Sequence, residues 1–500
     1  MVNSYLGIDI GTSGCKAVVF DSNGKQLASS YREYSVIFSE DGGAELNSDE
    51  VINKCFEVIK ECTDTIKPNI VNAIGISSQG EAFTPIGFNG ETLHNCMISS
   101  DVRPKPYVKR FLDNFDDDKL YRITGHTAQQ LFTLFKILWF KDNRAELWKK
   151  TKYFLCFEDL LQYRLGLEPT ISYCLAGRTM MFDVLKEEWS KEILDEIGIT
   201  NEQLARPIPS GEVAGTIDPK IATELGLSKN TFIVAGGHDQ SCSALGAGVI
   251  EDGVAMYATG TVECITPISL KPVFTDELKK NNLCTYNFTI KNIYTTVAVS
   301  LTGGNILKWF RDQFGQLEID KAKQTGTDAY ELILNSVDEN PSDLLVLPYF
   351  TASGTPYFDT ETKGAILGLQ LSTKRGEIIK ALLEGVALEM RLNLEILHDS
   401  GYKISELRAV GGGAKSKMWT QLKADVLNKK ITTLNITEAG CLGVAMLACS
   451  KDKDIPIVDL VPTWVKPATT ISPKPENVAI YNEKYNKYKT LYQAIKKIKI

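Results

Sequence analysis

Gly7-Ile-Asp-Ile-Gly-Thr-Ser-Gly-Cys-Lys16 is the stretch that most clearly indicates how this chain folds. It joins two short apolar runs, residues 5–10 and 15–20, and the turn sequence Asp21-Ser-Asn-Gly24 leads into a third run from Gln26. Short β-prone runs separated by Gly, Ser, Asn and Asp are typical of strands joined by tight turns. The first residues therefore predict a β-meander.

A helix and a fourth strand are expected after the meander. Asn47, with Glu50 three residues later, resembles a capping box, which marks a helix start. Apolar residues then recur at helical spacing, at Val51, Cys55, Phe56, Ile59 and Cys62. Residues 71–77 are apolar and β-prone. Strands that alternate with helices indicate an α/β protein.

The second half of the chain repeats this pattern. Strands are expected at residues 231–235, 254–257 and 407–410, a β-rich stretch at 292–300, and helices at 305–311, 375–397 and 416–428. Because 500 residues exceed what one hydrophobic core usually serves, we expect two α/β domains, residues 1–245 and 246–500. A cleft between them is the expected ligand site.

The composition argues against several classes of protein. The formal net charge is -7 and no basic stretch is interleaved with aromatic residues, so we expect no nucleic-acid partner. No stretch is long and apolar enough to predict a membrane span or a signal peptide. Eleven cysteines without a C-x-x-C pair and four dispersed histidines indicate reduced thiols in the cytoplasm and no zinc site. Whether the chain forms a homodimer is left open.

The first motif has the residues that a phosphate loop needs. Gly11 and the glycine at position 14 allow close approach of a phosphate, Thr12 and Ser13 offer hydroxyls, and Lys16 offers positive charge. Asp9, at the end of the first strand, is suited to hold Mg²⁺. The motif is neither a Walker A loop nor a Rossmann fingerprint. A hairpin turn without any ligand is the alternative.

The second motif is Val234-Ala-Gly-Gly-His-Asp239-Gln240, in which a strand runs into two glycines and then a carboxylate. We expect the glycines to leave room for a substrate, and Asp239 to accept a proton from a hydroxyl nucleophile. His238 is not the expected base, because neighbouring side chains of an extended segment point in opposite directions. A strand-ending turn with a surface Asp is the alternative.

Three further small-residue turns end strand-like runs: Ala258-Thr-Gly-Thr261, Thr302-Gly-Gly-Asn305 and Gly411-Gly-Gly-Ala-Lys-Ser416. Backbone N–H groups at the start of a helix bind phosphate readily. Each turn alone is a weak signal. Turns of this kind in both halves of the chain indicate a nucleotide held between two similar domains.

Together these motifs resemble the FGGY carbohydrate kinase family, from Gly7 to about residue 450. The similar segments are the loop from Asp9 to Lys16, Lys136-Ile-Leu-Trp139, Gly236-Gly-His-Asp-Gln240, Gly260-Thr261, Leu347-Pro-Tyr-Phe, Gly364-Ala-Ile-Leu-Gly368, Gly411-Gly-Gly-Ala-Lys-Ser-Lys-Met-Trp419 and Glu438-Ala-Gly-Cys-Leu-Gly443. The resemblance implies two ribonuclease-H-like domains, of the actin, hexokinase and heat-shock chaperone type, with a nucleotide cleft between them. It also implies ATP-dependent phosphorylation of a sugar or polyol hydroxyl, with Mg²⁺.

The resemblance assigns roles to individual residues. Asp239 would be the general base and, with Asp9, a Mg²⁺ ligand, and Gln240 would lie beside the sugar. The residues implied to contact ATP are Gly11, Thr12, Ser13, Lys16, Gly260, Thr261, Gly304, Gly412, Gly413 and Ala414. The acceptor would be a ketose such as xylulose or a related pentulose or hexulose.

The chain departs from the family pattern where substrate is chosen. Gln79-Gly80-Glu81 stands where xylulokinases usually carry Q-M-H-G and glycerol kinases Q-R-E, so Glu81 is expected to accept hydrogen bonds from substrate hydroxyls. Asp101 is a second candidate substrate contact, although an ion pair with Arg103 explains it equally well. Glu263 lies close to the expected phosphate path, and the sequence leaves its direction open.

Three other functions remain open at this point. The chain could be an actin- or chaperone-type ATP switch, a kinase for another small polyhydroxylated metabolite, or a sugar sensor without catalysis. Against the switch stand Asp239 and the polar residues from Gln79 to Glu81, which would face the same cleft.

Overall fold

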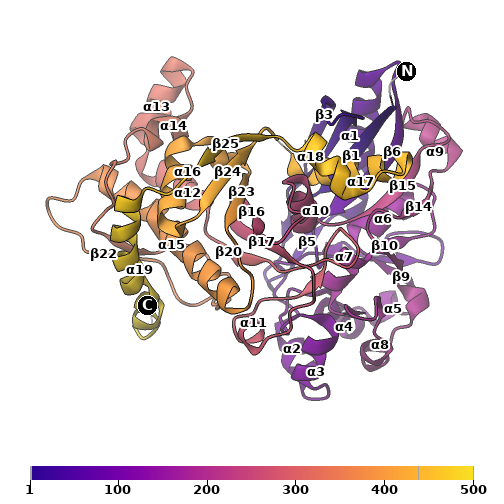
Figure 1. Ribbon diagram of the computed structural model, residues 1–500. Helices are drawn as coiled ribbons and strands as arrows, with labels where there is room; N and C mark the ends of the chain where they lie inside the picture. Colours follow the sequence, from indigo (N-terminus) through magenta and orange to yellow (C-terminus); the bar gives the residue numbers. More distant parts are fainter. Residues whose placement is uncertain (1–2, 437, 499–500) are drawn as a thin grey trace.

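The computed structural model describes residues 3–436 and 438–498 and consists of two lobes, each built on a mixed β-sheet (Figure 1). The N-terminal sheet has the strand order β14-β15-β6-β1-β2-β3. Its strands are β1 (Asn3–Ile10), β2 (Gly14–Asp21), β3 (Gln26–Glu33), β6 (Ile70–Ser78), β14 (Val213–Thr216) and β15 (Phe232–His238). The strands β1, β2 and β3 are antiparallel neighbours, and β6 and β15 run parallel to β1. The meander and the α/β layering expected from the sequence are confirmed.

Two groups of helices cover the faces of the N-terminal sheet. Helix α1 (Ser48–Ile66) begins at Asn47, whose side chain accepts a hydrogen bond from the backbone N–H of Glu50. Side chains alternate along β1, so Leu6 joins the apolar core that contains α1, whereas Gly7 faces helix α17 (Ala439–Lys453). Asp9, two residues further on, shares the α17 face.

Smaller elements fill the rest of the N-terminal lobe. Its helices are α2 (Lys105–Leu112), α3 (Asp117–Thr124), α4 (Thr133–Asn143), α5 (Ala145–Trp148), α6 (Phe157–Arg164), α7 (Tyr173–Ala176), α8 (Lys191–Ile197), α9 (Pro219–Glu224) and α10 (Asp239–Gly246). Its short strands are β4 (Ile37–Phe38), β5 (Ala44–Leu46), β7 (Thr84–Gly87), β8 (Cys96–Met97), β9 (Thr151–Leu155), β10 (Thr170–Ser172), β11 (Phe182–Asp183), β12 (Glu188–Trp189) and β13 (Arg206–Ile208).

The C-terminal sheet has the strand order β18-β19-β17-β16-β23-β24-β25, and β20 also pairs with β17. Its strands are β16 (Val254–Thr259), β17 (Glu263–Ser269), β18 (Tyr286–Asn287), β19 (Tyr294–Thr295), β20 (Ala298–Ser300), β23 (Glu406–Val410), β24 (Lys430–Leu434) and β25 (Pro467–Ile471). The pair β21 (Leu345–Leu347) and β22 (Ala365–Leu367) lies apart from it. The helices are α11 (Asp276–Lys280), α12 (Gly304–Phe314), α13 (Gln316–Thr325), α14 (Ala329–Leu334), α15 (Arg375–Asp399), α16 (Lys417–Leu427), α18 (Ile457–Trp464) and α19 (Pro475–Lys496).

Helix α17 joins the two lobes although it is late in the chain. It packs against β1, β6 and α10, beside residues more than 190 positions earlier, as Figure 1 shows. The packing is close: a Cβ on Gly7 would lie 1.9 Å from the carbonyl oxygen of Cys441, so only glycine fits there. One apolar core contains residues of both sheets together with α10 and α17. These two helices therefore form one of the contacts between the lobes; β18 forms another, because Tyr286 packs with Cys174 and Val184 of the N-terminal lobe.

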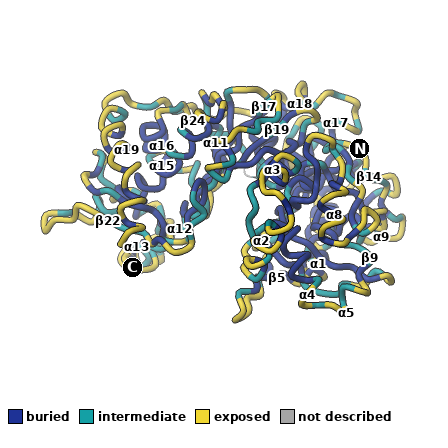
Figure 2. The backbone as a smooth tube through the Cα atoms, turned by 90° about the horizontal axis from the view of Figure 1, so that it is seen from below, coloured by how far each residue is buried: buried dark blue, intermediate teal, exposed yellow. Residues whose placement is uncertain are grey.

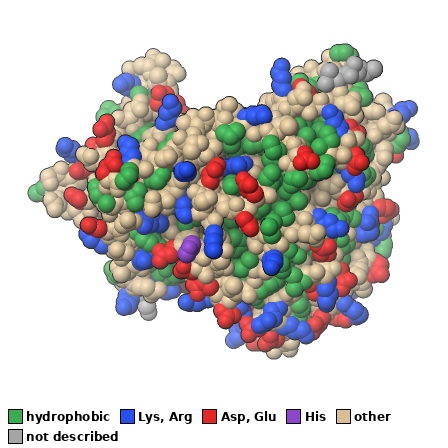
Figure 3. Space-filling model, viewed as in Figure 1, with side chains coloured by type: hydrophobic (Ala, Val, Ile, Leu, Met, Phe, Trp, Pro, Cys, Tyr) green, Lys and Arg blue, Asp and Glu red, His purple; other side chains and the backbone are tan. Residues whose placement is uncertain are grey.

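The interior of each lobe is buried, as the dark blue segments of Figure 2 show. All eleven cysteines are free and buried, in agreement with thiols that pack as small hydrophobes. Among the described residues, no helix is both long enough and apolar enough to cross a membrane. On the face seen in Figure 3, basic and acidic side chains are interspersed.

The C-terminal helix α19 is anchored by a buried ion pair. Lys484 Nζ lies 2.5 Å from a carboxylate oxygen of Glu384 on α15 and donates to the carbonyl oxygen of Ser342 at 2.7 Å. The hydroxyl of Tyr481 donates to the other oxygen of Glu384. The lysine side chain is 8% exposed and that of Glu384 is fully buried. This carboxylate therefore depends on protein donors.

We expect Lys484→Met to lower the free energy of unfolding by about 3 kcal/mol, because it leaves the buried Glu384 carboxylate without its cation. Lys489→Met is the matched control on the same helix. Its partner Glu395 is about 40% exposed, so the loss should stay below about 1 kcal/mol. Urea unfolding of both variants measures the difference. Equal losses would show that the buried pair adds nothing beyond a surface pair.

Candidate active site

The hairpin turn between β1 and β2 is held in place by Gln79. The backbone N–H of Gln79 donates to the carbonyl oxygen of Ile10 at 2.8 Å, and its side-chain amide donates to that of Gly11 at 3.2 Å. Thr12 donates its hydroxyl to the side-chain oxygen of Gln79 at 3.1 Å. Thr12 and Ser13 are exposed at the tip of the turn. The turn is thus fixed at its base and open at its tip, as a phosphate loop requires.

Two charged residues flank this turn. Asp9 is partly buried and accepts a hydrogen bond from the Ser77 hydroxyl at 2.6 Å. Lys16 forms an ion pair with Glu438, its Nζ lying 2.5 Å from the carboxylate, and both side chains remain about 30% exposed. Lys16 therefore already has an anionic partner when no phosphate is bound.

The strand β15 presents Asp239 as the first residue of α10. Sheet pairing of β15 with β6 is interrupted between Val234 and Gly237, and there the backbone N–H of Gly236 donates to the buried carboxylate of Glu158 at 2.8 Å. A Cβ on Gly236 would lie 1.8 Å from the carbonyl oxygen of Ile76. Gly236 is therefore required because strand β6 packs against it. The expectation that the glycine leaves room for substrate is wrong for Gly236.

A second expectation about this segment is also wrong. His238 does not point away from Asp239, because its Nε2 lies 3.2 Å from a carboxylate oxygen of Asp239. The alternation of side chains applies only within a strand, and the strand ends at His238. His238 is nevertheless buried, and burial with the charge of Arg178 holds its pKa well below the usual value. A neutral imidazole thus lies beside the carboxylate.

Asp239 has the electrostatic character of a base poised near neutral pH. Its side chain is 29% exposed. Burial, followed by the negative charges of Asp9 and Glu81, raises the pKa of Asp239 to about 7. Burial also raises the pKa of Asp9, and Glu438 adds to this, while the Ser77 hydroxyl opposes it. A nearby cation would stabilise the ionised form of both carboxylates.

These two carboxylates suit Mg²⁺ that arrives with a nucleotide. No cluster of three or more metal-ligating side chains occurs among the described residues. Mg²⁺ is commonly bound through one or two carboxylates together with substrate phosphates. Asp9 and Asp239 fit that pattern, because a divalent cation would relieve the repulsion that raises the pKa of Asp239.

Gln79-Gly80-Glu81 lies between the hairpin turn and the Asp239 segment. A Cβ on Gly80 would meet the His238 ring at 2.9 Å. Glu81 forms an ion pair with Arg178, which donates from Nε to the carboxylate at 2.7 Å. Both side chains are at most 12% exposed. Arg178 had no recognisable signal in the sequence.

The three other residues considered near the acceptor or the phosphate path lie in different environments. Asp101 is fully buried in an ion pair with Arg103, whose Nη2 lies 2.5 Å from it, so the structure does not bring Asp101 to the cleft. Gln240 is partly buried, and its side-chain oxygen is buried without a hydrogen-bond partner among the described residues. Glu263 points into the core, where its carboxylate pairs with Lys423 at 2.5 Å. Glu263 is therefore no obstacle to a phosphate.

A cavity of about 560 Å³ in the C-terminal lobe gathers the remaining small-residue turns. The turns touch each other, since the backbone N–H of Gly304 donates to the carbonyl oxygen of Gly260 at 2.8 Å. A Cβ on Gly412 would meet no atom within 4 Å. The cavity is lined by Thr259, Gly260, Thr261, Gly304, Asn305, Leu307, Lys308, Asp328, Tyr330, Leu334, Gly412, Gly413, Lys415, Ser416 and Trp419. Its volume and its open glycine fit a nucleoside.

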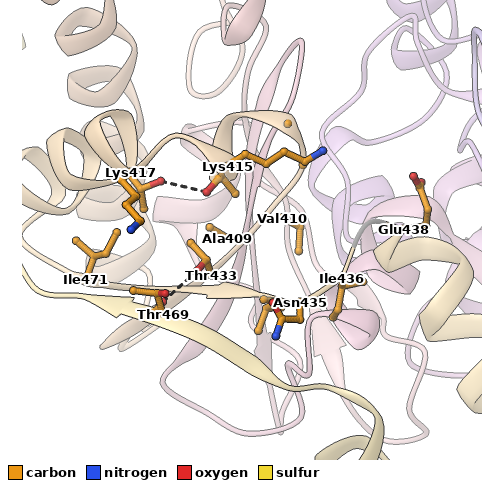
Figure 4. A pocket seen from close by; sticks show the side chains of 15 residues that line it. Ala409, Val410, Lys415, Lys417, Thr433, Asn435, Ile436, Glu438, Thr469 and Ile471 are labelled. Atoms are coloured by element: carbon orange, nitrogen blue, oxygen red, sulfur yellow. Dashed lines mark hydrogen bonds between the residues drawn. The ribbon is translucent and has the colours of Figure 1, made fainter. Parts of the chain in front are cut away.

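A second cavity, of about 620 Å³, shares Gly412 and Lys415 with the first and is shown in Figure 4. Gly412, Ala414 and Lys415 line this space together with Asn435 and Glu438. Gly412 thus borders both cavities. Ala414 borders only the second cavity, so the structure does not bring it to the same wall as Gly260 and Gly304.

Comparison with known proteins gives matches over most of the chain. The FGGY family of carbohydrate kinases, N-terminal domain, matches residues 4–246, and its C-terminal domain matches residues 255–451. The xylulose kinase of Bacillus subtilis (strain 168) is 27% identical over 97% of this chain and 96% of its own length. The gluconokinase of the same organism is 29% identical over 89% of this chain and 87% of its own.

Solved structures agree with the fold. The ligand-bound xylulose kinase from Lactobacillus acidophilus superposes with a TM-score of 0.89 at 23% identity, covering 99% of this chain and 98% of that one. Gluconate kinase from the same organism gives a TM-score of 0.88 at 23% identity, with 99% and 98% coverage. The two-domain architecture expected from the sequence is confirmed.

Proposed function

The chain belongs to the FGGY family of carbohydrate kinases and is a sugar kinase, and we propose that it transfers the terminal phosphoryl group of ATP to a hydroxyl of a ketose such as xylulose or a related pentulose or hexulose. Relatives named xylulose kinase support this choice of acceptor. The observation that carries the proposal is the position of Asp239, a partly exposed carboxylate with a pKa near 7 that lies close to Asp9 and Glu81.

In this proposal Asp239 accepts the proton of the attacking hydroxyl. Gln240 supports the orientation of the acceptor, because its unpaired side-chain oxygen can accept a hydrogen bond from a second hydroxyl. Phosphoryl transfer needs in-line positioning and charge neutralisation more than covalent help from the protein. Asp239 therefore acts mainly by holding the hydroxyl and removing its proton.

ATP is proposed to lie with its adenosine in the 560 Å³ cavity and its phosphates between the two lobes. Gly412, Gly413, Gly260 and Gly304 would line its path, and Thr12, Ser13 and Lys16 would contact the terminal phosphates. Asp9 and Asp239 would hold Mg²⁺ together with the nucleotide, and the ion would supply positive charge near the transferred phosphoryl group. Lys16 would then exchange Glu438 for phosphate.

We also propose a domain boundary between residues 245 and 246 and a cytoplasmic location. The boundary falls at the end of α10, one of the two helices shared by the lobes. The buried free cysteines suit a reducing compartment.

The direct test is to identify the product. The purified protein is incubated with ATP, Mg²⁺ and each of a set of ketopentoses, ketohexoses and polyols, and new phosphomonoester resonances are sought by ³¹P NMR. The proposal predicts one phosphorylated acceptor, with coupling to the carbon that bears the hydroxyl. Formation of inorganic phosphate alone with every acceptor would contradict it.

The raised pKa of Asp239 predicts the pH dependence of the reaction. A base must be ionised to accept a proton, so kcat/KM for the acceptor should fall at low pH, with a midpoint at or below about 7 because bound Mg²⁺ would lower the pKa of Asp239. Glu81→Gln removes one of the charges that raise this pKa and should move the midpoint to lower pH. A rate that is independent of pH from about 5 to about 8 would exclude a base that titrates in this range.

A further inference from the structure

The positively charged side chain of Arg178, near Asp239, already has protein partners. Arg178 donates from Nε and Nη2 to the same oxygen, Oε1 of Glu81. Its Nη1 lies 3.1 Å from Nε2 of His126 and 3.6 Å from the sulfur of Cys284. All three nitrogens of the guanidinium thus have protein partners. We call Glu81, Arg178, Asp239 and Gln240 the acceptor corner.

The two histidines near this corner do not supply positive charge. The Nδ1 atom of His126 lies 2.8 Å from the carbonyl oxygen of Thr124, which only accepts, so Nδ1 carries the proton and Nε2 accepts from Arg178. Burial and the charge of Arg178 lower the pKa of His126 well below its usual value. His238 is neutral for the same reasons.

The lysine that contacts the backbone of Glu81 has no free hydrogen-bonding role toward a ligand. Lys136 is fully buried and donates to the carbonyl oxygens of Glu81 at 2.8 Å and Leu131 at 2.5 Å. The hydroxyl of Thr133 also donates to the carbonyl of Glu81, at 2.9 Å. These bonds hold Glu81 at a φ of 60°, in the left-handed region that a glutamate rarely adopts. The carboxylate of Glu81 is therefore rigidly placed.

What the acceptor corner offers to a ligand is a set of hydrogen-bond acceptors. Gln240 has a buried side-chain oxygen without a partner among the described residues, and Asp239 and Glu81 are carboxylates. A sugar hydroxyl can donate to each of these groups. A substrate carboxylate only accepts, and here it would meet two carboxylates and find no uncommitted side-chain cation among the residues described above, while the proposed Mg²⁺ is shared with the phosphates of ATP.

From this arrangement we infer that the acceptor corner selects an uncharged ketose or polyol and rejects aldonates and other acidic sugars. Glu81 is the specificity-determining residue, and Arg178 is a positioning residue that holds its carboxylate. The inference rests on the proposed function and narrows it, because relatives named xylulose kinase and gluconokinase are almost equally similar to this chain. A site built to pair with hydroxyl donors discriminates strongly against a group that cannot donate.

The test uses neutral and acidic acceptors that share a carbon skeleton. Initial rates of ADP formation are measured with xylulose, ribulose, xylitol, arabinitol and glucitol, and with xylonate, arabinonate and gluconate. For the wild type we expect kcat/KM of the best neutral acceptor to exceed that of the best aldonate by about 100-fold or more. The ratio of these two values is the readout.

Three variants test whether the ratio of kcat/KM for neutral and acidic acceptors depends on the Glu81–Arg178 ion pair. Glu81→Gln removes a negative charge and frees the guanidinium of Arg178, so the ratio should shrink by about tenfold or more. In Glu81→Gln combined with Arg178→Gln the shrinkage should disappear, since the freed cation is gone. Arg178→Gln alone should lower kcat/KM for neutral acceptors and leave the ratio high. A purely structural role for either residue would lower all rates together and leave the ratio unchanged.

The outcomes separate this inference from the proposed function. An aldonate that is the best acceptor of the wild type would overturn the inference and leave the sugar kinase in place. A folded Glu81→Gln protein with an unchanged ratio would overturn the role of Glu81. If that variant does not fold, the wild-type ratio alone decides. ATP hydrolysis without phosphorylation of any acceptor would instead overturn the proposed function.

Discussion

Asp239→Asn is expected to lower kcat/KM for the phosphoryl acceptor by about a thousandfold. Asparagine has nearly the shape of aspartate but cannot take up the hydroxyl proton, and it removes one of the two carboxylates proposed to hold Mg²⁺. The measurement is the rate of acceptor-dependent ADP formation at saturating ATP. Asp252→Asn, at an exposed loop residue, is the matched control and should leave the rate unchanged.

The same substitution should not harm the fold. Burial and the charges of Asp9 and Glu81 disfavour the ionised form of Asp239 and raise its pKa from 3.8 to about 7. A group whose pKa is raised on folding stabilises the protein at low pH, and this contribution is lost as the pH rises toward about 7. Above that pH, Asp239→Asn should unfold at the same temperature as the wild type or higher. A variant that keeps more than a tenth of the activity would exclude Asp239 as the base.

Gly412→Val is expected to raise KM for ATP by about 100-fold while the protein stays folded. A Cβ at this position meets no atom within 4 Å, so the fold has room for it. The branched side chain would occupy space at the wall of the 560 Å³ cavity proposed to hold adenosine. KM for ATP and for the acceptor are measured separately, and only the first should change.

Gly412 also borders the 620 Å³ cavity of Figure 4, so a second substitution is needed. Asn435→Trp fills only that larger cavity, since Asn435 does not line the smaller one. We expect it to leave KM for ATP unchanged. A larger effect of Asn435→Trp than of Gly412→Val would place the nucleotide in the larger cavity.

The sequence predicted those turns and helix starts that depend on residues close together in the chain. The turn residues from Gly11 to Gly14 sit in the hairpin, and Asn47 caps the first long helix. The packing of α17 against the first sheet could not be predicted in this way. The segment from Glu438 to Gly443 resembles a family motif, but it contains no information on which strand the helix meets.

The same distinction between local and long-range contacts holds for the residues of the candidate site. Asp9, Asp239 and Gly412 lie at strand ends or turns, which sequence patterns reveal. Arg178, Glu158 and Glu438 meet their partners across 97, 78 and 422 residues of chain, so no spacing in the sequence identifies them. For Asp101 the sequence left a substrate contact and an ion pair with Arg103 equally open, and its burial against Arg103 favours the ion pair.

The central claim is that ATP is consumed only when a sugar hydroxyl receives the phosphoryl group. The most direct test is to follow ADP formation by the wild type with Mg-ATP alone and after addition of a neutral ketose or polyol. We expect a negligible rate without acceptor, a large increase with one of these compounds, and loss of that increase in Asp239→Asn. Equal ATP consumption with and without every acceptor, unaffected by Asp239→Asn, would contradict it and favour a nucleotide switch.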